Sequence, residues 1–425
     1  MLTIHKAHRL EGRITVPGDK SISHRAVMLS SISKGTSSIK GFLRGEDCLS
    51  TIACFRGLGI SIEDKGDEII VHGKGLYGLK EPEDVLDAGN SGTTIRLLSG
   101  ILAGQEFITI VTGDKSLRSR PMARIAVPLR QMGASIEGRD YGNLAPIVIR
   151  GGNLKAIDYD SPVSSAQVKS AILLAGLYSE GSTIVREEIT SRDHTEKMLK
   201  ALGADINTED GVVSIKKSEL VAQDIEVPGD ISSAAFFMAA AAAMPGSHLV
   251  LEKVGLNPTR TGIIDVLKEM GAEITIDNLF ISGGEEIGDI IVKGTKLRGI
   301  NITRDIIPRL IDEIPVIAVI AAVAEGKTII TGAEELKVKE SNRITTMVTE
   351  MKKLGIQVKE LPDGMEIEGL NQITGGTTES YGDHRIAMAM AICGLFANGP
   401  VKINNSDCIA VSFPDFQEKL KAVIK

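Results

Sequence analysis

The sequence predicts an α/β fold built from six copies of one repeat unit. Two features recur along the chain and stay in phase: a polar segment that leads into an Ala-rich apolar helix, and an amphipathic helix that ends in a Leu-Gly or Met-Gly pair. A third feature, a pair of short alternating segments around a Gly turn, follows the second. Such periodic self-similarity is typical of proteins assembled from repeated supersecondary units.

The polar segments are short, and each precedes a helix of small and branched apolar residues. Successive segments start between 66 and 84 residues apart. They begin at Gly18, Gly89, Ser161, Val227, Ile311 and Tyr381. Each unit should therefore contain two helices and several strands.

Glycine marks the end of the amphipathic helix at residues 59, 133, 203, 271 and 355. Gly just past the last helical turn is the usual left-handed cap. The segments that follow, such as residues 60–73 and 204–217, alternate in polarity around a turn and predict β-hairpins. The last unit ends instead in a helix at residues 416–425 and needs no hairpin.

The composition is that of a globular protein with more than one domain. The chain has 425 residues, of which 43% are hydrophobic, and this length exceeds that of one ordinary core. A net charge of −7 gives no general attraction to nucleic acid or acidic membranes, so an anionic substrate needs a local basic cluster. The N-terminus lacks the apolar core of a signal peptide, and the four cysteines form no metal or disulfide pattern, so we expect a reduced, cytoplasmic protein.

The polar segments place basic side chains near helix starts. A helix N-terminus attracts anions through its free N–H groups and its dipole, and Lys or Arg there is unfavourable unless an anion shares the site. Capping alone by Ser, Asp and Gly remains the alternative for any single unit. The basic residues in or beside these segments are Lys20, Arg25, Arg96, Arg120, Lys169, Arg192, Lys339, Arg343 and Arg385. Their number favours more than one anionic ligand.

Two carboxylates, Asp312 and Glu313, begin an otherwise apolar stretch. A carboxylate that enters a buried helix needs a partner or a chemical task, and a raised pKa suits acid–base work. N-capping by Asp312 is the alternative interpretation. No motif indicates a metal site, a nucleotide P-loop or a covalent nucleophile.

Motifs along essentially the full length resemble 5-enolpyruvylshikimate-3-phosphate (EPSP) synthases. They are GDKSISHR (18–25), GNSGTTIR (89–96), SRPM (119–122), SSAQVKSAILLAGL (164–177), SRDHTEKML (191–199), IDEIP (311–315), VKESNR (338–343), GDHRIAMA (382–389) and SFPDF (412–416). Each motif alone is modestly specific, whereas the whole set in this order is highly specific. The motifs beginning at Ser164 and Ser191 look like those of the bacterial class II branch.

The resemblance implies a two-domain, pseudo-symmetric fold of six β-α-β-α-β-β units with the active site in the cleft between the domains. The first domain would contain residues 1–17 plus 229–425, and the second would contain residues 18–228. The independent repeat count agrees, because three repeats start between Gly18 and Val227.

Two binding sets follow from the same resemblance. The residues expected to bind shikimate 3-phosphate are Lys20, Ser21, Arg25, Ser165, Gln167, Ser191, Arg192, Asp312 and Lys339. Those expected to bind phosphoenolpyruvate are Lys20, Gly92, Arg120, Gln167, Arg343 and Arg385. A side chain at Gly92 would intrude where glyphosate binds in the family, so a glyphosate-sensitive site is expected. Many relatives carry a Lys where this chain has Val411, which removes one expected cation.

The implied reaction is addition followed by elimination, with Asp312, Glu340 and Lys20 as catalytic residues. We assign Asp312 to the substrate hydroxyl, Glu340 to the methylene proton, and Lys20 to a shared proton transfer and the leaving phosphate. An exchange of these duties among the three remains open. The resemblance implies no metal and no organic cofactor, and we expect a monomer whose domains close over its ligands.

Two rival functions are carried forward. A UDP-N-acetylglucosamine enolpyruvyl transferase shares fold and donor, but normally has a Cys in a mobile loop near residue 115, where this chain has none. A non-catalytic anion-binding protein of the same fold would have lost Lys20, Asp312, Glu340 or Arg385, all of which are present.

Overall fold

The computed structural model describes residues 1–370 and 372–425 and divides the chain into two compact units. Unit 1 comprises Met1–Pro17, Gly229–Phe280 and Glu286–Lys425, and unit 2 comprises Gly18–Pro228 and Ile281–Glu285. Each unit has its own hydrophobic core.

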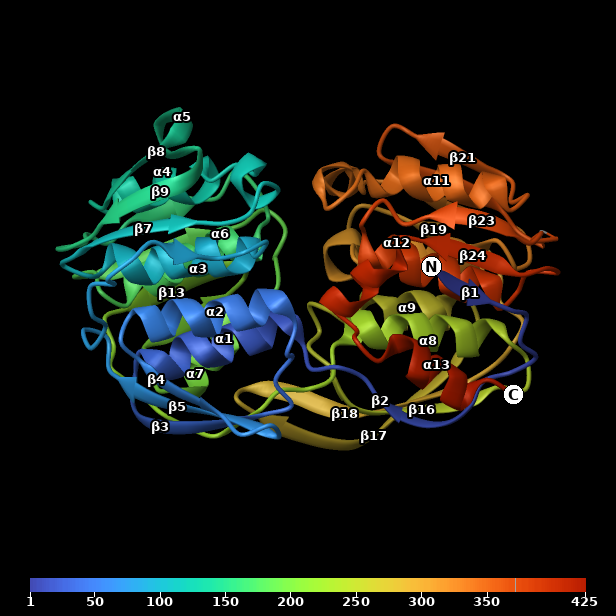
Figure 1. Ribbon diagram of the computed structural model, residues 1–425, viewed down its shortest axis with the longest axis horizontal. Helices are drawn as coiled ribbons and strands as arrows, with labels where there is room; N and C mark the ends of the chain where they lie inside the picture. The colour runs from blue at the N-terminus through green and yellow to red at the C-terminus, as the bar shows by residue number, and fades with distance from the viewer. Residues whose placement is uncertain (371) are drawn as a thin grey trace. The chain divides into compact units, whose positions relative to one another are not determined.

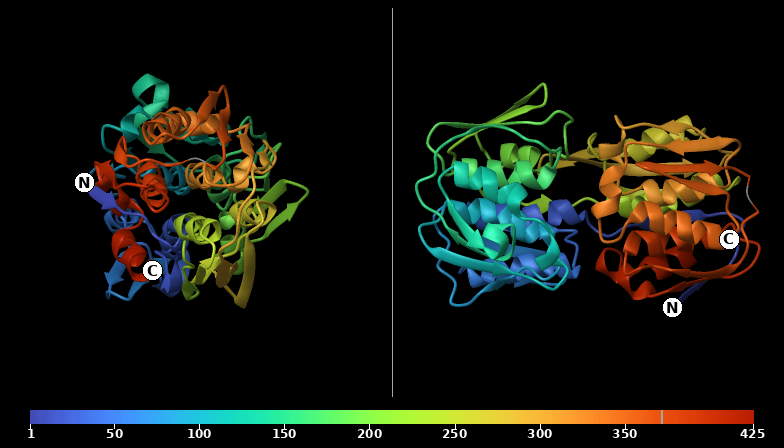
Figure 2. Two further views of the ribbon diagram at one scale, coloured as in Figure 1. Left: turned by 90° about the vertical axis from the view of Figure 1, so that its right-hand side faces the viewer. Right: turned by 90° about the horizontal axis from the view of Figure 1, so that it is seen from above.

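In unit 2, small sheets surround a group of largely buried helices (Figure 1 and Figure 2). The strand orders are β14-β3-β5-β4, with β15 also on β3, then β6-β7-β9-β8 and β10-β11-β13-β12. The strands are β3 (Ser33–Lys40), β4 (Ser61–Asp64), β5 (Glu68–Lys74), β6 (Leu86–Asp87), β7 (Ile108–Thr112), β8 (Ser135–Gly138), β9 (Leu144–Arg150), β10 (Asp158–Asp160), β11 (Ser182–Arg186), β12 (Ile206–Glu209), β13 (Val212–Lys216), β14 (Leu220–Val221) and β15 (Ile225–Glu226). The helices are α1 (Lys20–Ser31), α2 (Glu46–Gly57), α3 (Gly92–Ala103), α4 (Ala123–Gln131), α5 (Arg139–Gly142), α6 (Ala166–Gly176) and α7 (His194–Ala201).

Unit 1 repeats this plan with strand orders β17-β18-β16-β2, β19-β20-β22-β21 and β1-β24-β23. Its strands are β1 (Leu2–Ile4), β2 (Glu11–Thr15), β16 (His248–Gly255), β17 (Glu273–Ser282), β18 (Glu285–Lys293), β19 (Asn301–Ile302), β20 (Lys327–Ile330), β21 (Val358–Leu361), β22 (Gly364–Glu368), β23 (Gly376–Glu379) and β24 (Val401–Asn404). Its α-helices are α8 (Ile231–Ala243), α9 (Gly262–Glu269), α10 (Ile314–Ala321), α11 (Arg343–Lys353), α12 (His384–Gly394) and α13 (Phe416–Val423). The N-terminal strands β1 and β2 pair with β24 and β16, which ties residues 1–17 to the C-terminal half.

The predicted repeat is confirmed at the helix starts. Asp19, Ser91, Asp230 and Asp383 precede α1, α3, α8 and α12, and the side chain of each accepts a backbone N–H of its helix. The small, apolar residues that follow let these helices lie buried; α8, for example, is buried along nearly its whole length.

The predicted helix ends are confirmed as well. The glycines at 59, 133, 203, 271 and 355 all have positive φ, between +81° and +106°. This backbone conformation is one that Gly adopts without the steric cost a Cβ would bring. The two hairpins predicted after such glycines form as β4–β5 and β12–β13.

One boundary differs from the prediction. Residues 229–425 were expected to lie together, but the turn of the β17–β18 hairpin, Ile281–Glu285, groups with unit 2. The reason is two sets of contacts: Ser282 Oγ accepts the Glu226 N–H, and Glu285 is buried beside His194 Nδ1 at 2.7 Å. An extended hairpin can therefore belong by its strands to one unit and by its turn to the other.

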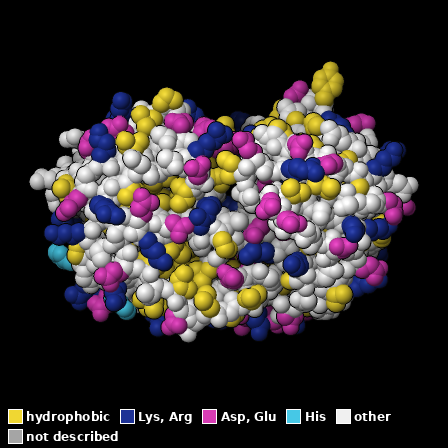
Figure 3. All heavy atoms as spheres, turned by 180° about the vertical axis from the view of Figure 1, so that it is seen from behind, with side chains coloured by type: hydrophobic (Ala, Val, Ile, Leu, Met, Phe, Trp, Pro, Cys, Tyr) yellow, Lys and Arg dark blue, Asp and Glu magenta, His cyan; other side chains and the backbone are white. Residues whose placement is uncertain are grey.

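Charged side chains of both signs are interspersed on the face shown in Figure 3, without a large field of one sign. Among the described residues, no helix combines the length and apolar character needed to cross a membrane.

Candidate active site

In unit 1, a buried guanidinium joins three carboxylates. Arg343, the first residue of α11, is 1% exposed. Its Nε lies 2.8 Å from Asp383 Oδ2, its Nη1 lies 3.1 Å from Asp312 Oδ1, and its Nη2 lies 2.6 Å from Glu340 Oε2. This network brings together the predicted Asp312, Glu340 and Arg343.

Asp312 also lies near the other two predicted cations of this unit, Lys339 and Arg385. Lys339 Nζ and Arg385 Nε each lie 3.8 Å from Asp312 Oδ1, and Arg385 Nη1 donates to the Asp312 carbonyl. The N-capping alternative for Asp312 is wrong, because α10 begins at Ile314 and its N-cap residue is Glu313. The Asp312 carboxylate thus lies beside three cations, Arg343, Lys339 and Arg385.

Burial raises the pKa of the adjacent Glu313, with a further contribution from Asp312. Its carboxyl group is hydrogen-bonded to Ser232 at the start of α8, and Ser232 also accepts from Arg260. Ser232 is thus the partner of Glu313 Oε1, and Glu313 is a buried group that connects the starts of α8 and α10.

The pKa of each of two neighbours in this cluster, Glu340 and His384, is lowered, so both favour the deprotonated form. Burial opposes ionisation of Glu340, but the attraction of Arg343 prevails and holds its pKa below the usual range. Burial, reinforced by Arg385, lowers the pKa of His384 to about 3. At neutral pH Glu340 is therefore ionised and His384 is uncharged.

In unit 2, Arg96 and Arg120 lie beside Gly92, and the charge of a third arginine, Arg124, acts on Arg96. A Cβ built at Gly92 would lie 3.4 Å from Arg96 Nη1 and 3.5 Å from Arg120 Nη1. Burial lowers the pKa of Arg96 to about 10, and the charges of Arg124 and Arg120 add to the effect. Because the guanidinium groups repel one another, an anion here relieves an existing electrostatic cost.

Side chains from separate elements hold these arginines in place. Arg96 Nη1 donates to Gln167 Oε1 at 2.5 Å, and Gln167 Nε2 donates to Thr93 Oγ1 at 3.0 Å. Arg120 donates to the backbone and side chain of Asn90. The structure thus joins the predicted Gly92, Arg120 and Gln167 and adds Arg96, which the sequence marked only as one cation near a Gly-rich turn.

The first two turns of α1 contribute Lys20, Ser21 and Arg25. Lys20 Nζ pairs with Asp47 of α2. Arg25 is buried, and donates to Thr195 Oγ1 at 2.7 Å, to Ser170 Oγ at 2.8 Å and to the Ser21 carbonyl at 3.0 Å. Burial lowers the pKa of Arg25 to about 10, although Glu196 opposes this.

The predicted Ser165 and Ser191 meet on one carboxylate that the sequence did not single out. Glu187 accepts from the N–H groups of both serines at 3.0 Å and from Ser191 Oγ at 2.8 Å. Arg192 directly follows Ser191 and is half-buried. A lone Glu between a strand and a loop gives no sequence signal of such a role.

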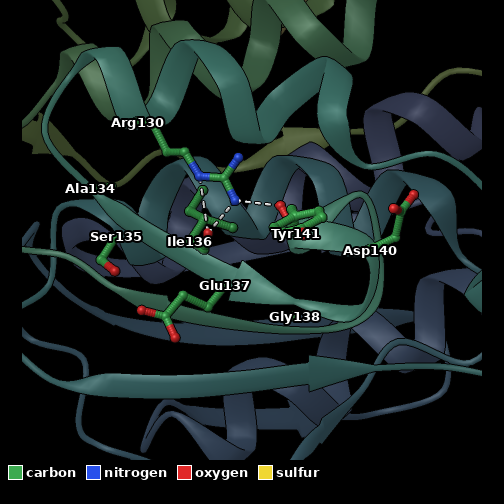
Figure 4. A pocket seen from close by; sticks show the side chains of 8 residues that line it. All are labelled: Arg130, Ala134, Ser135, Ile136, Glu137, Gly138, Asp140 and Tyr141. Atoms are coloured by element: carbon green, nitrogen blue, oxygen red, sulfur yellow. Dashed lines mark hydrogen bonds between the residues drawn. The ribbon is translucent and has the colours of Figure 1, made fainter.

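A separate open hollow lies between α4, β8 and α5 (Figure 4). Arg130 reaches across it to the carbonyls of Ile136 and Tyr141. None of the predicted site residues lines it, so it is unrelated to the basic clusters.

The α/β repeat fold carries buried guanidinium and carboxylate groups near its helix starts. This combination indicates a protein that binds small molecules with several negative charges. The model of the EPSP synthase (3-phosphoshikimate 1-carboxyvinyltransferase) family matches residues 4–420. The chain is 77% identical over 425 residues to the 3-phosphoshikimate 1-carboxyvinyltransferase of Alkaliphilus metalliredigens, covering 100% of both chains. It is 54% identical to that of Bacillus cytotoxicus over 424 residues, again covering 100% of both.

Solved structures agree with the sequence relatives. The EPSP synthase of Acinetobacter baumannii superposes with a TM-score of 0.92 at 49% identity, over 99% of this chain and 98% of that one. The chain therefore belongs to the EPSP synthase family.

Proposed function

We propose that this chain transfers the enolpyruvyl group of phosphoenolpyruvate to the 5-hydroxyl of shikimate 3-phosphate and releases phosphate. The observation that carries this function is the cluster around Arg343, where Asp312, Glu340, Lys339 and Arg385 meet. It offers carboxylates for proton transfer directly beside cations for a carboxylate and a phosphate, which is what the reaction requires.

The substrates divide among the basic clusters as the resemblance implies. Shikimate 3-phosphate binds Lys20, Ser21, Arg25, Ser165, Gln167, Ser191, Arg192, Asp312 and Lys339, and phosphoenolpyruvate binds Lys20, Gly92, Arg120, Gln167, Arg343 and Arg385. Support comes from the convergence of arginines beside Gly92 and from the burial of Arg25 and Arg343. Arginine suits these ligands because its planar guanidinium binds carboxylate or phosphate oxygens in pairs.

The addition step forms a bond between the 5-oxygen and C2 of phosphoenolpyruvate. The hydroxyl proton passes to Asp312, and C3 gains a proton from Glu340. In the elimination step the bond from C2 to the phosphate oxygen breaks, and C3 returns a proton to Glu340. Lys20 stabilises the negative charge on the departing phosphate and passes a proton to it. The proton that Asp312 took from the hydroxyl then replaces the one that Lys20 gave up, so all three groups return to their starting states.

The ionised state of Glu340 affects its assignment as the proton donor to C3 in the addition step. An ionised carboxylate is suited to remove the proton from C3, but it has no proton to deliver in the addition step. When the carboxylate of phosphoenolpyruvate binds Arg343, it adds negative charge beside Glu340 and draws away part of the attraction of Arg343. Both effects raise the pKa of Glu340 and favour its proton-carrying form.

Further features belong to the same proposal. The motifs beginning at Ser164 and Ser191 support the class II branch, and Gly92 supports inhibition by glyphosate in competition with phosphoenolpyruvate. We also infer a monomer that acts in the cytoplasm without metal or organic cofactor.

The function is tested by phosphate release from phosphoenolpyruvate, with shikimate 3-phosphate, shikimate and UDP-N-acetylglucosamine as parallel acceptors. Turnover with shikimate 3-phosphate alone is expected. Turnover with UDP-N-acetylglucosamine would favour the rival transferase, and binding of anions without turnover would favour a non-catalytic protein.

A further inference from the structure

The Glu187 carboxylate links two loops that carry Ser165 and Ser191, which are both predicted to bind shikimate 3-phosphate. Ser165 precedes α6, and Ser191 lies in the loop that leads into α7. Glu187 Oε1 accepts the Ser165 N–H at 3.0 Å, Glu187 Oε2 accepts the Ser191 N–H at 3.0 Å, and both oxygens lie 2.8 Å from Ser191 Oγ. One buried side chain thus fixes the backbone of both loops.

Lys169 forms a buried ion pair with Glu187. Its Nζ lies 3.1 Å from Glu187 Oε2 and 2.8 Å from Glu196 Oε1, and it donates to the Ser191 carbonyl at 3.1 Å. The side chains of Lys169 and Glu187 are each only 2% exposed. A buried ion pair with further hydrogen bonds holds its geometry tightly, because loss of either partner leaves an unpaired buried charge.

The same network reaches the buried guanidinium of Arg25. Arg25 donates to Ser170 on α6 and to Thr195 on α7, and these two hydroxyls lie 2.6 Å apart. Lys169 and Glu196 lie on the same two helices. The relative placement of α6 and α7 therefore sets the position of Arg25 as well as those of Ser165 and Ser191.

We propose that Glu187, held by Lys169, is a positioning residue for the phosphate group of shikimate 3-phosphate. This inference rests on the proposed function. Glu187 keeps the two backbone N–H groups, while the Ser191 hydroxyl, which has a single proton to donate, rotates toward the substrate phosphate. The negative Glu187 itself does not touch the phosphate, because Lys169 and the loop backbone surround its oxygens.

The alternative is displacement, in which the phosphate takes over the donors that Glu187 holds in the ligand-free unit. The two alternatives predict opposite effects of removing the negative charge. If Glu187 positions the loops, Glu187→Gln weakens binding of shikimate 3-phosphate. If the phosphate displaces Glu187, the same change strengthens binding because a competing anion is lost.

Calorimetric titration of the full chain with shikimate 3-phosphate, without phosphoenolpyruvate, separates these outcomes. We expect Glu187→Gln to raise the Kd about tenfold or more, from the loss of hydrogen bonds to a charged group. The KM for phosphoenolpyruvate should change less than about twofold. The exposed neighbour Glu188 provides the matched control, because Glu188→Gln removes the same charge at the next residue along the loop.

Glu187→Asp retains the carboxylate and provides a second variant should Glu187→Gln fold poorly; we expect it to recover part of the lost affinity. An unchanged or lower Kd in Glu187→Gln would overturn the inference, as would equal losses for both substrates. If the wild-type chain turns over shikimate 3-phosphate and Glu187→Gln binds it with the wild-type Kd, only this inference is refuted. Absence of wild-type turnover would instead refute the proposed function.

Discussion

Arg343 remains charged in a buried position because carboxylates surround it. Asp312, Glu340 and Asp383 all lie within 3.1 Å of its nitrogens, and their attraction outweighs burial and raises its pKa. Loss of one of these partners would alter the other pairs, since residues of one network are coupled. The Arg343 network is therefore where single-residue predictions are sharpest.

Glu340→Gln should slow exchange of the C3 hydrogens of phosphoenolpyruvate with solvent by about a hundredfold or more, the usual range for loss of a general acid–base group. The exchange is followed by NMR in deuterated buffer with both substrates present. Exposed Glu334 provides the control, and Glu334→Gln should exchange at the wild-type rate. Unchanged exchange in Glu340→Gln would contradict this role and would indicate that Lys20 or Asp312 transfers the C3 proton.

His384 makes stability depend on pH. Its pKa falls to about 3 in the folded chain because of burial and Arg385, whereas an unfolded His titrates near about 6.5. The unfolded state therefore binds more protons in this window, and the free energy of unfolding should decrease as pH falls from about 6.5 toward 4. Urea unfolding at several pH values should show a shallower decrease in His384→Asn; an identical slope would contradict this origin.

At the residue scale, the sequence predicted chemistry better than it predicted partners. Arg343 and Asp312 lie in recognisable motifs and charged segments of the sequence, and in the structure they form an ion pair. Glu187 lay in no polar helix start, and its contacts with Ser165 and Ser191 depend on how two loops fold together. Such a tertiary contact has no local sequence signature.

At the scale of the element, helix boundaries were predictable because capping is local chemistry. Asp19 and Asp383 cap the helices they precede, and the glycines that end helices have positive φ. Both devices act within a few residues of the helix end, so the sequence alone carries them.

Gly203 permits a clean test of the helix-end prediction. Its φ is +94°, and a Cβ there would meet no atom within 4 Å. Gly203→Ala should lower the free energy of unfolding by about 1 to 2 kcal/mol, solely from the backbone conformation. Gly203→Asn should cost less, because Asn tolerates this conformation better; urea unfolding would measure both, and equal stability of Gly203→Ala and wild type would contradict the explanation.

The β17–β18 hairpin was the element whose placement the sequence did not predict. Its alternating pattern indicates strands, but pattern does not show that the turn at Ile281–Glu285 groups with unit 2. That placement depends on the His194–Glu285 contact, between residues 91 positions apart. Long-range contacts of this kind lie beyond local pattern.

At the scale of the whole molecule, the predicted ligands are distributed over both units. Lys20, Arg120 and Gln167 belong to unit 2, whereas Asp312, Arg343 and Arg385 belong to unit 1. A substrate that binds residues of both units would link the two units, and we therefore expect the domain closure that the family resemblance implies.

Small-angle X-ray scattering should show a smaller radius of gyration with shikimate 3-phosphate and glyphosate together than without ligand. Arg343→Met should reduce this compaction, because it removes a phosphoenolpyruvate-side cation from unit 1. Equal radii with and without both ligands would contradict closure.

The most direct test of the whole account is solvent deuterium incorporation during turnover. The wild-type chain is mixed with phosphoenolpyruvate and shikimate 3-phosphate in deuterated buffer, and the enolpyruvyl product is analysed by mass spectrometry and NMR. Addition followed by elimination predicts deuterium in the C3 methylene of the product, with one phosphate released for each product formed. Product that carries no deuterium, or phosphate release without product, would contradict the proposed chemistry.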